Sequence, residues 1–472
     1  MTEPLTFKEL SEIEPLQSVD DNDLLLGYSK SGNKIGLISV GKVSSSQWAG
    51  CRWRKDSATT VGEPCGSLAK IERLGDLLGL GGYLVQNDHS RRKLSAGTHK
   101  LFANGAAASL AGDMGHYQWG WGVTIYYATW EDDTYEYEAI DVKPIPGQRN
   151  YVIPPGSRSC AGYATLDRVN GNLVSFVSYD AQYRGGNNDE RLDSAFNSQL
   201  CKPASNVAIA SFATAARKNG NMWLANSRVM FFITAAIKRI FFHNRNIQEA
   251  FNATLTADGL HQGGTGTGVG SVSDWSGTWK NYPYINLDAG VELGDAIGTF
   301  SVSINDNGTT KNIAGIPNFF GLKNDYKYLY CMCEDVLLQC NADLSQSVYI
   351  QNDIDGSTFD LTKVADKLLV GRTPIYAKGE WKYISRLNLE NLVMFPLEVG
   401  ATSSTGYADG YYNPASASGL RGALCLGAAG SGGGAGSAFL YGDHAPSGAY
   451  AFRAACLCEF AKPFSTEPTL IS

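Results

Sequence analysis

The residues with the clearest catalytic potential in this sequence are four carboxylates, Asp132, Asp133, Glu136 and Glu138, which fall within seven positions. A pair of carboxyl groups can act as general acid and general base in glycoside hydrolysis. Nucleophilic catalysis has no comparable pattern, because the sequence contains no G-x-S-x-G motif and its histidines keep no recognisable spacing to a serine or cysteine. We therefore interpret the four carboxylates as solvated side chains at strand edges, and we predict that the protein is not an enzyme.

Ten cysteines are distributed along the chain, and two close pairs, Cys331 with Cys333 and Cys456 with Cys458, are separated by a single residue. Zinc-binding pairs have roughly two to four intervening residues and a second pair that often includes histidine. None of the six histidines falls at such a spacing. We predict no metal and no cofactor, and we expect free, mostly buried thiols, as in proteins made in a reducing cytoplasm.

Two glycine-rich stretches, 264–270 and 427–436, resemble loops that could surround a phosphate group. Both lack the Lys-Ser/Thr ending of a phosphate-binding loop, and no apolar strand precedes the first. We predict plain glycine-rich loops without a nucleotide. The formal net charge is −7, and the densest basic run is only Arg91-Arg92-Lys93. Nucleic acid is therefore an unsuitable partner, because it requires a concentrated positive surface.

Membrane insertion and secretion are also not indicated. The first residues are acidic and lack the apolar core of a signal peptide. The most apolar stretch, Val229–Phe242, is interrupted by Lys238 and Arg239 and is too short to cross a bilayer. We expect a protein made in the cytoplasm that does not insert into a membrane.

The composition and local patterns favour an α+β fold in three parts. The chain contains 53 glycines, 24 tyrosines and 9 tryptophans, which is typical of a folded, loop-rich protein. Residues 1–45 are predicted to form a small β module for attachment or oligomerisation, with a hairpin from 23–28 and 34–40. Residues 46–200 are predicted to form a mixed α+β middle domain, and residues 201–472 a larger C-terminal domain.

Three local patterns support these domains. Ser67–Leu78 has a capping serine and helical spacing of apolar residues, whereas Gly120–Ile140 indicates two strands around an acidic turn. In the C-terminal domain, Trp223–Ile240 predicts a helix with one apolar face, and strands are expected at 298–304 and 326–333. The aromatic run His116–Trp130 is either a sugar-stacking platform or part of a core or subunit interface, and we favour the second interpretation.

Two segments carry a resemblance to known proteins. Gly315–Leu337 and Gly419–Ala455 resemble the C-type-lectin-like fold shared by formylglycine-generating enzymes and phage variable proteins, with Asn219–Phe251 as the helix that packs on its sheet. Tyr328 and Tyr330 stand where that family usually has a tryptophan pair. The family's reactive cysteine pair has no clear counterpart among the residues Cys425, Cys456 and Cys458, so no enzymatic activity is implied. The middle region, with 49–55, 81–93 and 114–127, is similar to large tail proteins of gut-associated bacteriophages.

The resemblance also implies a binding face in the last loops of the chain. In the phage variable proteins these loops bind the ligand while glycine and arginine, here Arg421 and Arg453, hold the scaffold. Tyrosine gives a large contact area at low entropic cost, and short polar side chains give adaptable hydrogen bonds. The alternative is a glycine-rich loop without a ligand. The implied ligand-binding residues are Tyr407, Asp409, Tyr411, Tyr412, Asn413, Ser431, Tyr441, Asp443, His444 and Tyr450.

The resemblance to phage tail proteins and variable proteins implies a structural protein of a bacteriophage virion, a tail fibre or receptor-binding protein. It is expected to attach to other virion proteins through residues 1–45 and to form a homo-oligomer, a trimer. Its C-terminal loops are expected to bind a host cell-surface glycan or protein, with avidity from many copies. The alternatives are a head-fibre or decoration protein without a ligand, and an enzyme that degrades polysaccharide or is related to formylglycine-generating enzymes.

Overall fold

The computed structural model contains two compact units, Met1–Trp48 and Ala49–Ser472, and it describes most of the second. The described residues are 24–29, 34–39, 48–178, 180–183, 203–251, 289–306, 309–325, 329–376, 379–414, 418–428, 431, 434–450 and 452–471. In the first unit, β1 (Leu24–Ser29) and β2 (Lys34–Ser39) form an antiparallel hairpin in which Leu24 pairs with Ser39. The predicted N-terminal hairpin is therefore confirmed.

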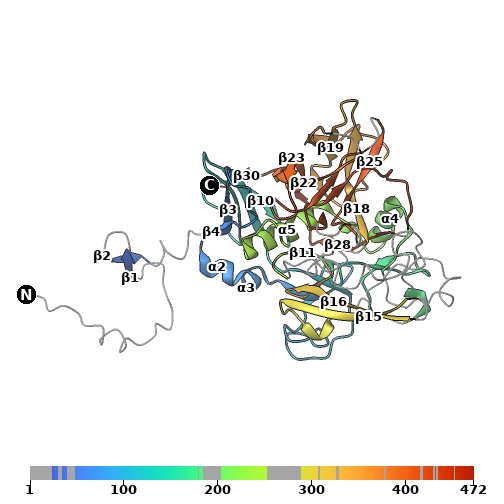
Figure 1. The fold of residues 1–472 in the computed structure, drawn as a ribbon. Coiled ribbons are helices and arrows are strands. Elements are labelled where there is room, and N and C mark those ends of the chain that lie inside the picture. Colours follow the sequence, from blue (N-terminus) through green and yellow to red (C-terminus); the bar gives the residue numbers. More distant parts are fainter. Residues whose placement is uncertain are drawn as a thin grey trace, which may run out of the picture. The chain divides into compact units, whose positions relative to one another are not determined.

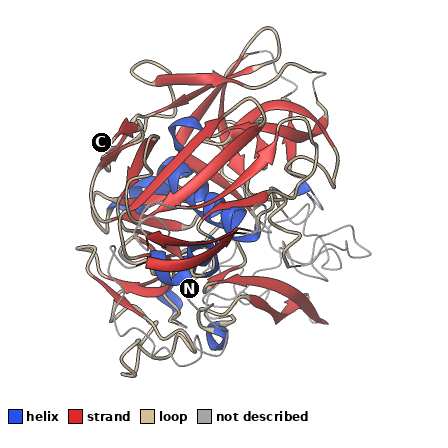
Figure 2. Cartoon of the chain, turned by 90° about the vertical axis from the view of Figure 1, so that its left-hand side faces the viewer, coloured by secondary structure: helices blue, strands red, loops and turns tan. Residues whose placement is uncertain are grey.

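The second unit is built mainly from β-sheets, as Figure 2 shows by the prevalence of strands over helices. Strands account for 40% of the structure and helices for 13%, so the predicted α+β fold class is wrong and the chain is mostly β. The reason lies in the length of the strands. Many have only two or three residues, which is too short for a period-2 pattern to distinguish them from loops.

Two six-stranded sheets contain most of the strands from the first half of this unit. Sheet I has the order β30 (Thr469–Leu470), β10 (Arg149–Ile153), β8 (Ile125–Glu131), β9 (Tyr135–Asp141), β3 (Ala49–Arg54) and β4 (Glu63–Gly66). Sheet II has the order β14 (Trp223–Ala225), β28 (Leu457–Phe460), β11 (Gly156–Ser159), β7 (His116–Trp121), β5 (Gly81–Val85) and β6 (Arg91–Lys93). Strands from both sides of residue 200, the expected domain boundary, thus share each sheet.

Sheet III has nine strands and comes entirely from the C-terminal half. Its order is β21 (Leu368–Arg372), β19 (Gln346–Ile350), β18 (Tyr330–Cys340), β25 (Leu420–Cys425), β26 (Leu440–Tyr441), β24 (Gly410–Tyr412), β22 (Trp381–Asn388) and β23 (Phe395–Ala401), with β27 (Arg453–Ala454) paired to β18. Smaller sheets join β12 (Thr165–Leu166) to β13 (Leu173–Val174), β15 (Gly298–Asp306) to β16 (Thr309–Phe319) and β17 (Leu322–Lys323), and β20 (Asp353–Ile354) to β29 (Phe464–Ser465).

The helices among the described residues are α2 (Leu68–Glu72), α3 (Leu74–Leu78), α4 (Ile209–Arg217) and α5 (Arg228–Phe242), with single 3-10 turns at Ala181–Tyr183, Val291–Leu293 and Glu390–Leu392. The predicted cap is confirmed, because the Ser67 side chain accepts a hydrogen bond from the Lys70 amide. Gly79 ends α3 with φ +66°, a left-handed conformation that favours glycine. None of these helices has the length and apolar character that a membrane crossing requires.

Helix α5 lies in the middle of the unit and packs against strands of all three sheets, including β3, β11 and β18 (Figure 1). The sequence predicts one apolar face starting at Trp223, but that residue belongs to β14 and every side chain from Arg228 to Ile240 is buried. Its charges are paired inside the core. Arg239 makes two hydrogen bonds to Glu138, at 2.7 and 2.8 Å, and Lys238 bonds Asp325 at 2.6 Å.

Candidate functional site

Four of the ten predicted ligand-binding residues lie in the core, so their assignment to a binding face is wrong. Tyr407, Asp409, Tyr411 and Asn413 are between 0 and 2% exposed. The Tyr411 hydroxyl donates to Thr373 Oγ1 at 2.9 Å, and Asp409 Oδ2 accepts from the Ala438 amide at 2.7 Å. Burial raises the pKa of Asp409 well above its ordinary value. These side chains hold neighbouring strands and loops together and do not belong to an exposed face of the C-terminal loops.

The physical reason for this error is the alternation of side chains along a strand. Tyr411 and Tyr412 are consecutive in β24, and consecutive residues of a strand project to opposite faces of its sheet. Tyr411 points into the core, and Tyr412 is half-buried at the surface. The sequence prediction placed both residues on one edge, although only one of them can face outward.

Tyr412 belongs to a row of aromatic residues that crosses three strands of sheet III. It pairs with Trp381 of β22 on one side and with Tyr441 of β26 on the other. Directly paired residues share a face of the sheet, so the three rings lie together. The ring centroids of Trp381 and Tyr412 are 5.1 Å apart, and those of Tyr412 and Tyr441 are 4.8 Å apart. Trp381 is 46% exposed.

The row continues into the loop after β26. The ring of Tyr441 contacts His444 at 5.1 Å between centroids, and His444 contacts Tyr450 at 5.4 Å. Tyr450 is 38% exposed. We call the five residues Trp381, Tyr412, Tyr441, His444 and Tyr450 the aromatic face. Four of them are predicted binding residues that the structure brings together, and Trp381 is the one that the sequence prediction missed.

Charged and polar side chains line the edge of the aromatic face. Asp443 lies 3.9 Å from Arg421, between the Asp443 Oδ1 and Arg421 Nε atoms, and both side chains are partly exposed. Burial raises the pKa of Asp443, although Arg421 opposes this shift. Ser431 is half-exposed, and its hydroxyl accepts from the Ala428 amide at 3.0 Å. Polar groups therefore stand beside exposed rings, as a site for a polar ligand requires.

Arg453 is buried beside the loop that carries His444 and Tyr450. It is 2% exposed, donates to the Gly448 carbonyl at 2.9 Å, and lies 4.4 Å from the centre of the Tyr450 ring. Burial, together with the nearby Arg453 and Arg421, lowers the pKa of His444 to about 4, so the imidazole is neutral at pH 7. The scaffold role expected for Arg453 agrees with this position. A guanidinium held under the loop fixes the geometry of Tyr450 and His444.

A second cluster has catalytic side chains but no access for a substrate. His99 Nε2 lies 2.9 Å from Asp295, and Cys160 Sγ lies 4.0 Å from His99 Nδ1 and 3.6 Å from Lys323 Nζ. Burial raises the pKa of the Cys160 thiol, but Lys323 and His99 outweigh it and lower the pKa. Cys160, His99 and Lys323 are all buried. We interpret the cluster as a buried polar network of the core.

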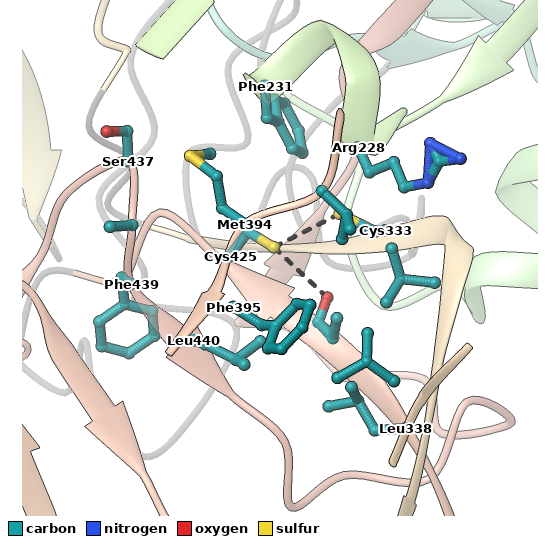
Figure 3. A pocket seen from close by; sticks show the side chains of 15 residues that line it. Arg228, Phe231, Cys333, Leu338, Met394, Phe395, Cys425, Ser437, Phe439 and Leu440 are labelled. Carbon is teal, nitrogen blue, oxygen red and sulfur yellow. Dashed lines mark hydrogen bonds between the residues drawn. The ribbon is translucent and has the colours of Figure 1, made fainter. Parts of the chain in front are cut away.

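Sheet III and α5 enclose a small cavity of about 20 Å³, shown in Figure 3. Its wall is formed largely by apolar side chains such as Phe231, Phe395 and Leu440. The sulfur atoms of Cys333 and Cys425 face each other there at 3.3 Å (Figure 3). A space of this volume holds about one water molecule. It is therefore a packing defect of the core and not a ligand site.

The remaining sequence predictions about chemistry concern cysteines, metals and carboxylates. Seven of the nine described cysteines are buried and none of the nine forms a disulfide, as predicted, and Cys201 lies outside the described residues. Within the described part of the chain, no group of three or more metal-ligating side chains comes together. Of the four carboxylates, Glu138 is buried beside Arg239, and Asp132 caps its own turn by accepting from the amides of Thr134 and Tyr135. The glycine-rich stretch 264–270 also lies outside the described residues.

The aromatic run 116–130 divides between core and surface. All six residues of β7 are buried, which favours the core interpretation over a sugar platform for that strand. Trp130, at the end of β8, is half-buried and stacks on Tyr137 with centroids 5.0 Å apart and an angle of 4° between the rings.

The comparison with other proteins adds no relative. No protein-family model matches this chain, and no curated protein matches it either.

Proposed function

We propose that this chain is a structural protein of a bacteriophage virion, a tail fibre or receptor-binding protein, that binds a host cell-surface glycan through the aromatic face. The observation that carries the proposal is the row of Trp381, Tyr412 and Tyr441 across three paired strands, continued by His444 and Tyr450. Rings fixed on a sheet lose little conformational entropy when they bind a ligand.

The chemistry of the face suits a saccharide. The C–H surfaces of a sugar ring pack on aromatic rings, and its hydroxyl groups need donors and acceptors at the edge of the contact. Asp443, Arg421 and the phenol groups of Tyr441 and Tyr450 supply both kinds of group. A shallow site of this type binds weakly, and many copies on one particle would raise the overall affinity.

The rest of the proposal follows from the sequence. The resemblance to tail proteins of gut-associated bacteriophages suggests the virion. The hairpin of β1 and β2 is a small unit that suits attachment to another virion protein or to other copies of this chain. We propose a trimer, because three copies present three aromatic faces to one cell surface.

The test is binding of the purified full chain to a panel of capsular polysaccharides and O-antigens from gut bacteria. We expect at least one polysaccharide to bind, and we expect Trp381→Ala and Tyr441→Ala each to weaken that binding about tenfold or more. Leu369→Ala is the matched control, because Leu369 is a large exposed apolar residue of the same sheet in β21. It is expected to bind like the parent chain.

Three results would contradict the proposal. Unchanged polysaccharide binding in the double variant Trp381→Ala/Tyr441→Ala would show that the aromatic face is not the site, and no binding at all would favour a decoration protein without a ligand. Shortened polysaccharide chains after incubation with the parent chain would establish a degrading enzyme. The double variant should keep the parent's melting temperature within a few degrees, since Trp381 is 46% exposed and Tyr441 is only half-buried.

A further inference from the structure

A polar groove lies between sheet I and the β22–β23 hairpin, and its lining includes none of the five residues of the aromatic face. It consists of two adjoining cavities of about 570 and 240 Å³. The two cavities share Glu131, Glu136, Arg245 and Arg386, so these four side chains stand where the cavities meet. The larger volume is within the range of roughly 300–1,000 Å³ that small-molecule sites have.

Ion pairs fix the side chains at this junction. Arg386 bonds Glu136 at 2.8 Å and Glu131 at 3.0 Å and lies 3.8 Å from Glu398. Arg245 also contacts Glu136. These residues come from β8, β9, the segment after α5, and β22–β23, which are far apart in the sequence. Because the pairs tie these elements together, the groove has its shape before any ligand arrives.

The charges on the wall of the larger cavity cancel. Its lining contains four basic and four acidic side chains, and each basic side chain has an acidic partner within 4.0 Å, as for Arg54 with Asp56 at 2.7 Å and Lys55 with Glu131 at 3.2 Å. A phosphate, sulfate or carboxylate ligand would gain no net attraction there and would have to displace a paired glutamate. A neutral ligand with many hydroxyl groups can donate to the carboxylates and accept from the guanidinium groups at the same time.

One donor in this wall is left without a protein partner. Arg245 is only 7% exposed, and its Nε atom has no hydrogen-bond partner among the described residues. The guanidinium is held between the rings of Trp53 and Tyr407, at 5.0 and 5.1 Å from their centres. The Nε atom itself is covered, but its side chain lines both cavities, and an unsatisfied donor at such a position marks a place for a ligand oxygen or a water molecule.

The smaller cavity adds an aromatic wall. Trp130 and Tyr137 line it, and their rings are parallel and in contact. From the charge balance of the larger cavity, the unsatisfied Arg245 donor and this pair of rings, we propose that the groove is a second binding site, specific for a neutral oligosaccharide. This site does not rest on the function proposed for the aromatic face, because the two sets of residues have no member in common.

The test is binding of the full chain to an array that carries neutral oligosaccharides and oligosaccharides with sulfate, phosphate or carboxylate groups. We expect neutral members to bind, and we expect Arg386→Ala and Trp130→Ala each to weaken that binding about tenfold. Trp381→Ala should leave these neutral members bound, which separates the groove from the aromatic face. Leu369→Ala serves again as the unchanged control.

Glu398→Gln keeps the test decisive if Arg386→Ala does not fold. Its carboxylate is largely exposed, so the substitution should not disturb folding, and it gives the lining one net positive charge. We expect this variant to bind acidic oligosaccharides more strongly than the parent chain does. The inference is overturned if the parent binds no neutral oligosaccharide or only acidic ones, or if binding of the neutral ones is lost in Trp381→Ala and kept in Arg386→Ala.

Discussion

Strand β7 and the aromatic face are similar in composition and opposite in role. β7 contains two tryptophans, a tyrosine and a histidine within six residues, and all six are buried. The aromatic face also combines tryptophan, tyrosine and histidine, yet its rings are half-buried or exposed. Strand β7 and the three strands that carry Trp381, Tyr412 and Tyr441 are all paired on either side. The difference is that both faces of β7 are covered, whereas one face of β22, β24 and β26 is open.

This comparison shows that aromatic content alone does not locate a binding surface. Trp and Tyr are the largest contributors to cores and to interfaces alike. What separates the two cases is coverage of the sheet by other elements, which depends on contacts between distant parts of the chain. Substitutions in the two regions should therefore have very different effects on stability.

The largest effect is expected for Trp119→Ala in β7. Trp119 is fully buried in sheet II, and removal of its indole leaves a cavity that the surrounding strands cannot fill. We expect the free energy of unfolding to fall by about 3–5 kcal/mol. Denaturant unfolding of the parent and variant chains measures this. A loss below about 1 kcal/mol would contradict the covered position assigned to β7.

The next largest effect on stability is expected at Tyr411 and should be absent at its neighbour in β24, Tyr412. Tyr411→Phe removes a buried hydroxyl that donates to Thr373, and we expect a loss of about 1 kcal/mol. Tyr412→Phe removes a hydroxyl at the surface, and we expect no measurable change in stability. Unfolding of the two matched variants tests the alternation directly. Equal losses would mean that the two side chains do not face opposite sides of the sheet.

Local signals account for the parts of the fold that the sequence predicts correctly. The Ser67 cap, the turn after β8 and the hairpin of β1 and β2 each depend on residues close together in the chain. The fold class failed because strands such as β26 have only two residues and pair with partners from distant segments.

The dependence on contacts between distant segments also explains which site residues the sequence could identify. Trp381 was missed because it precedes Tyr412 by about thirty residues, and only the pairing of β22 with β24 brings the two together. The error at Tyr411 was avoidable, since the period of two along a strand already separates it from Tyr412. No sequence signal indicates that Asp409 is buried. Its burial depends on a hydrogen bond from the backbone amide of Ala438, which lies 29 residues further along the chain.

An effect on stability similar to that of Tyr411→Phe is expected for Trp381→Ala on the aromatic face. Its indole contacts Tyr412, Tyr441 and Phe439 on one side and solvent on the other. We expect a loss of about 1 kcal/mol, mainly from the ring contacts. Denaturant unfolding beside Trp119→Ala provides the comparison. A loss as large as that of Trp119→Ala would mean that the face is covered and cannot bind a ligand.

The last effect is absent at neutral pH and concerns the protonation of His444 in the aromatic face. Its folded pKa of about 4 lies below the ordinary value of 6.5, mainly because of burial, with help from Arg453 and Arg421. A lowered pKa means that the folded state favours the neutral imidazole. The stability from this group is complete above pH 6.5 and is lost as the pH falls towards 4.

His444→Gln should therefore lose less stability than the parent chain between pH 6.5 and 4. Other groups titrate in both chains, so the difference between the two unfolding curves isolates His444. A parallel pair of curves over that window would show that the imidazole is not shielded by its ring neighbours, and the face would be more open than its contacts with Tyr441 and Tyr450 indicate.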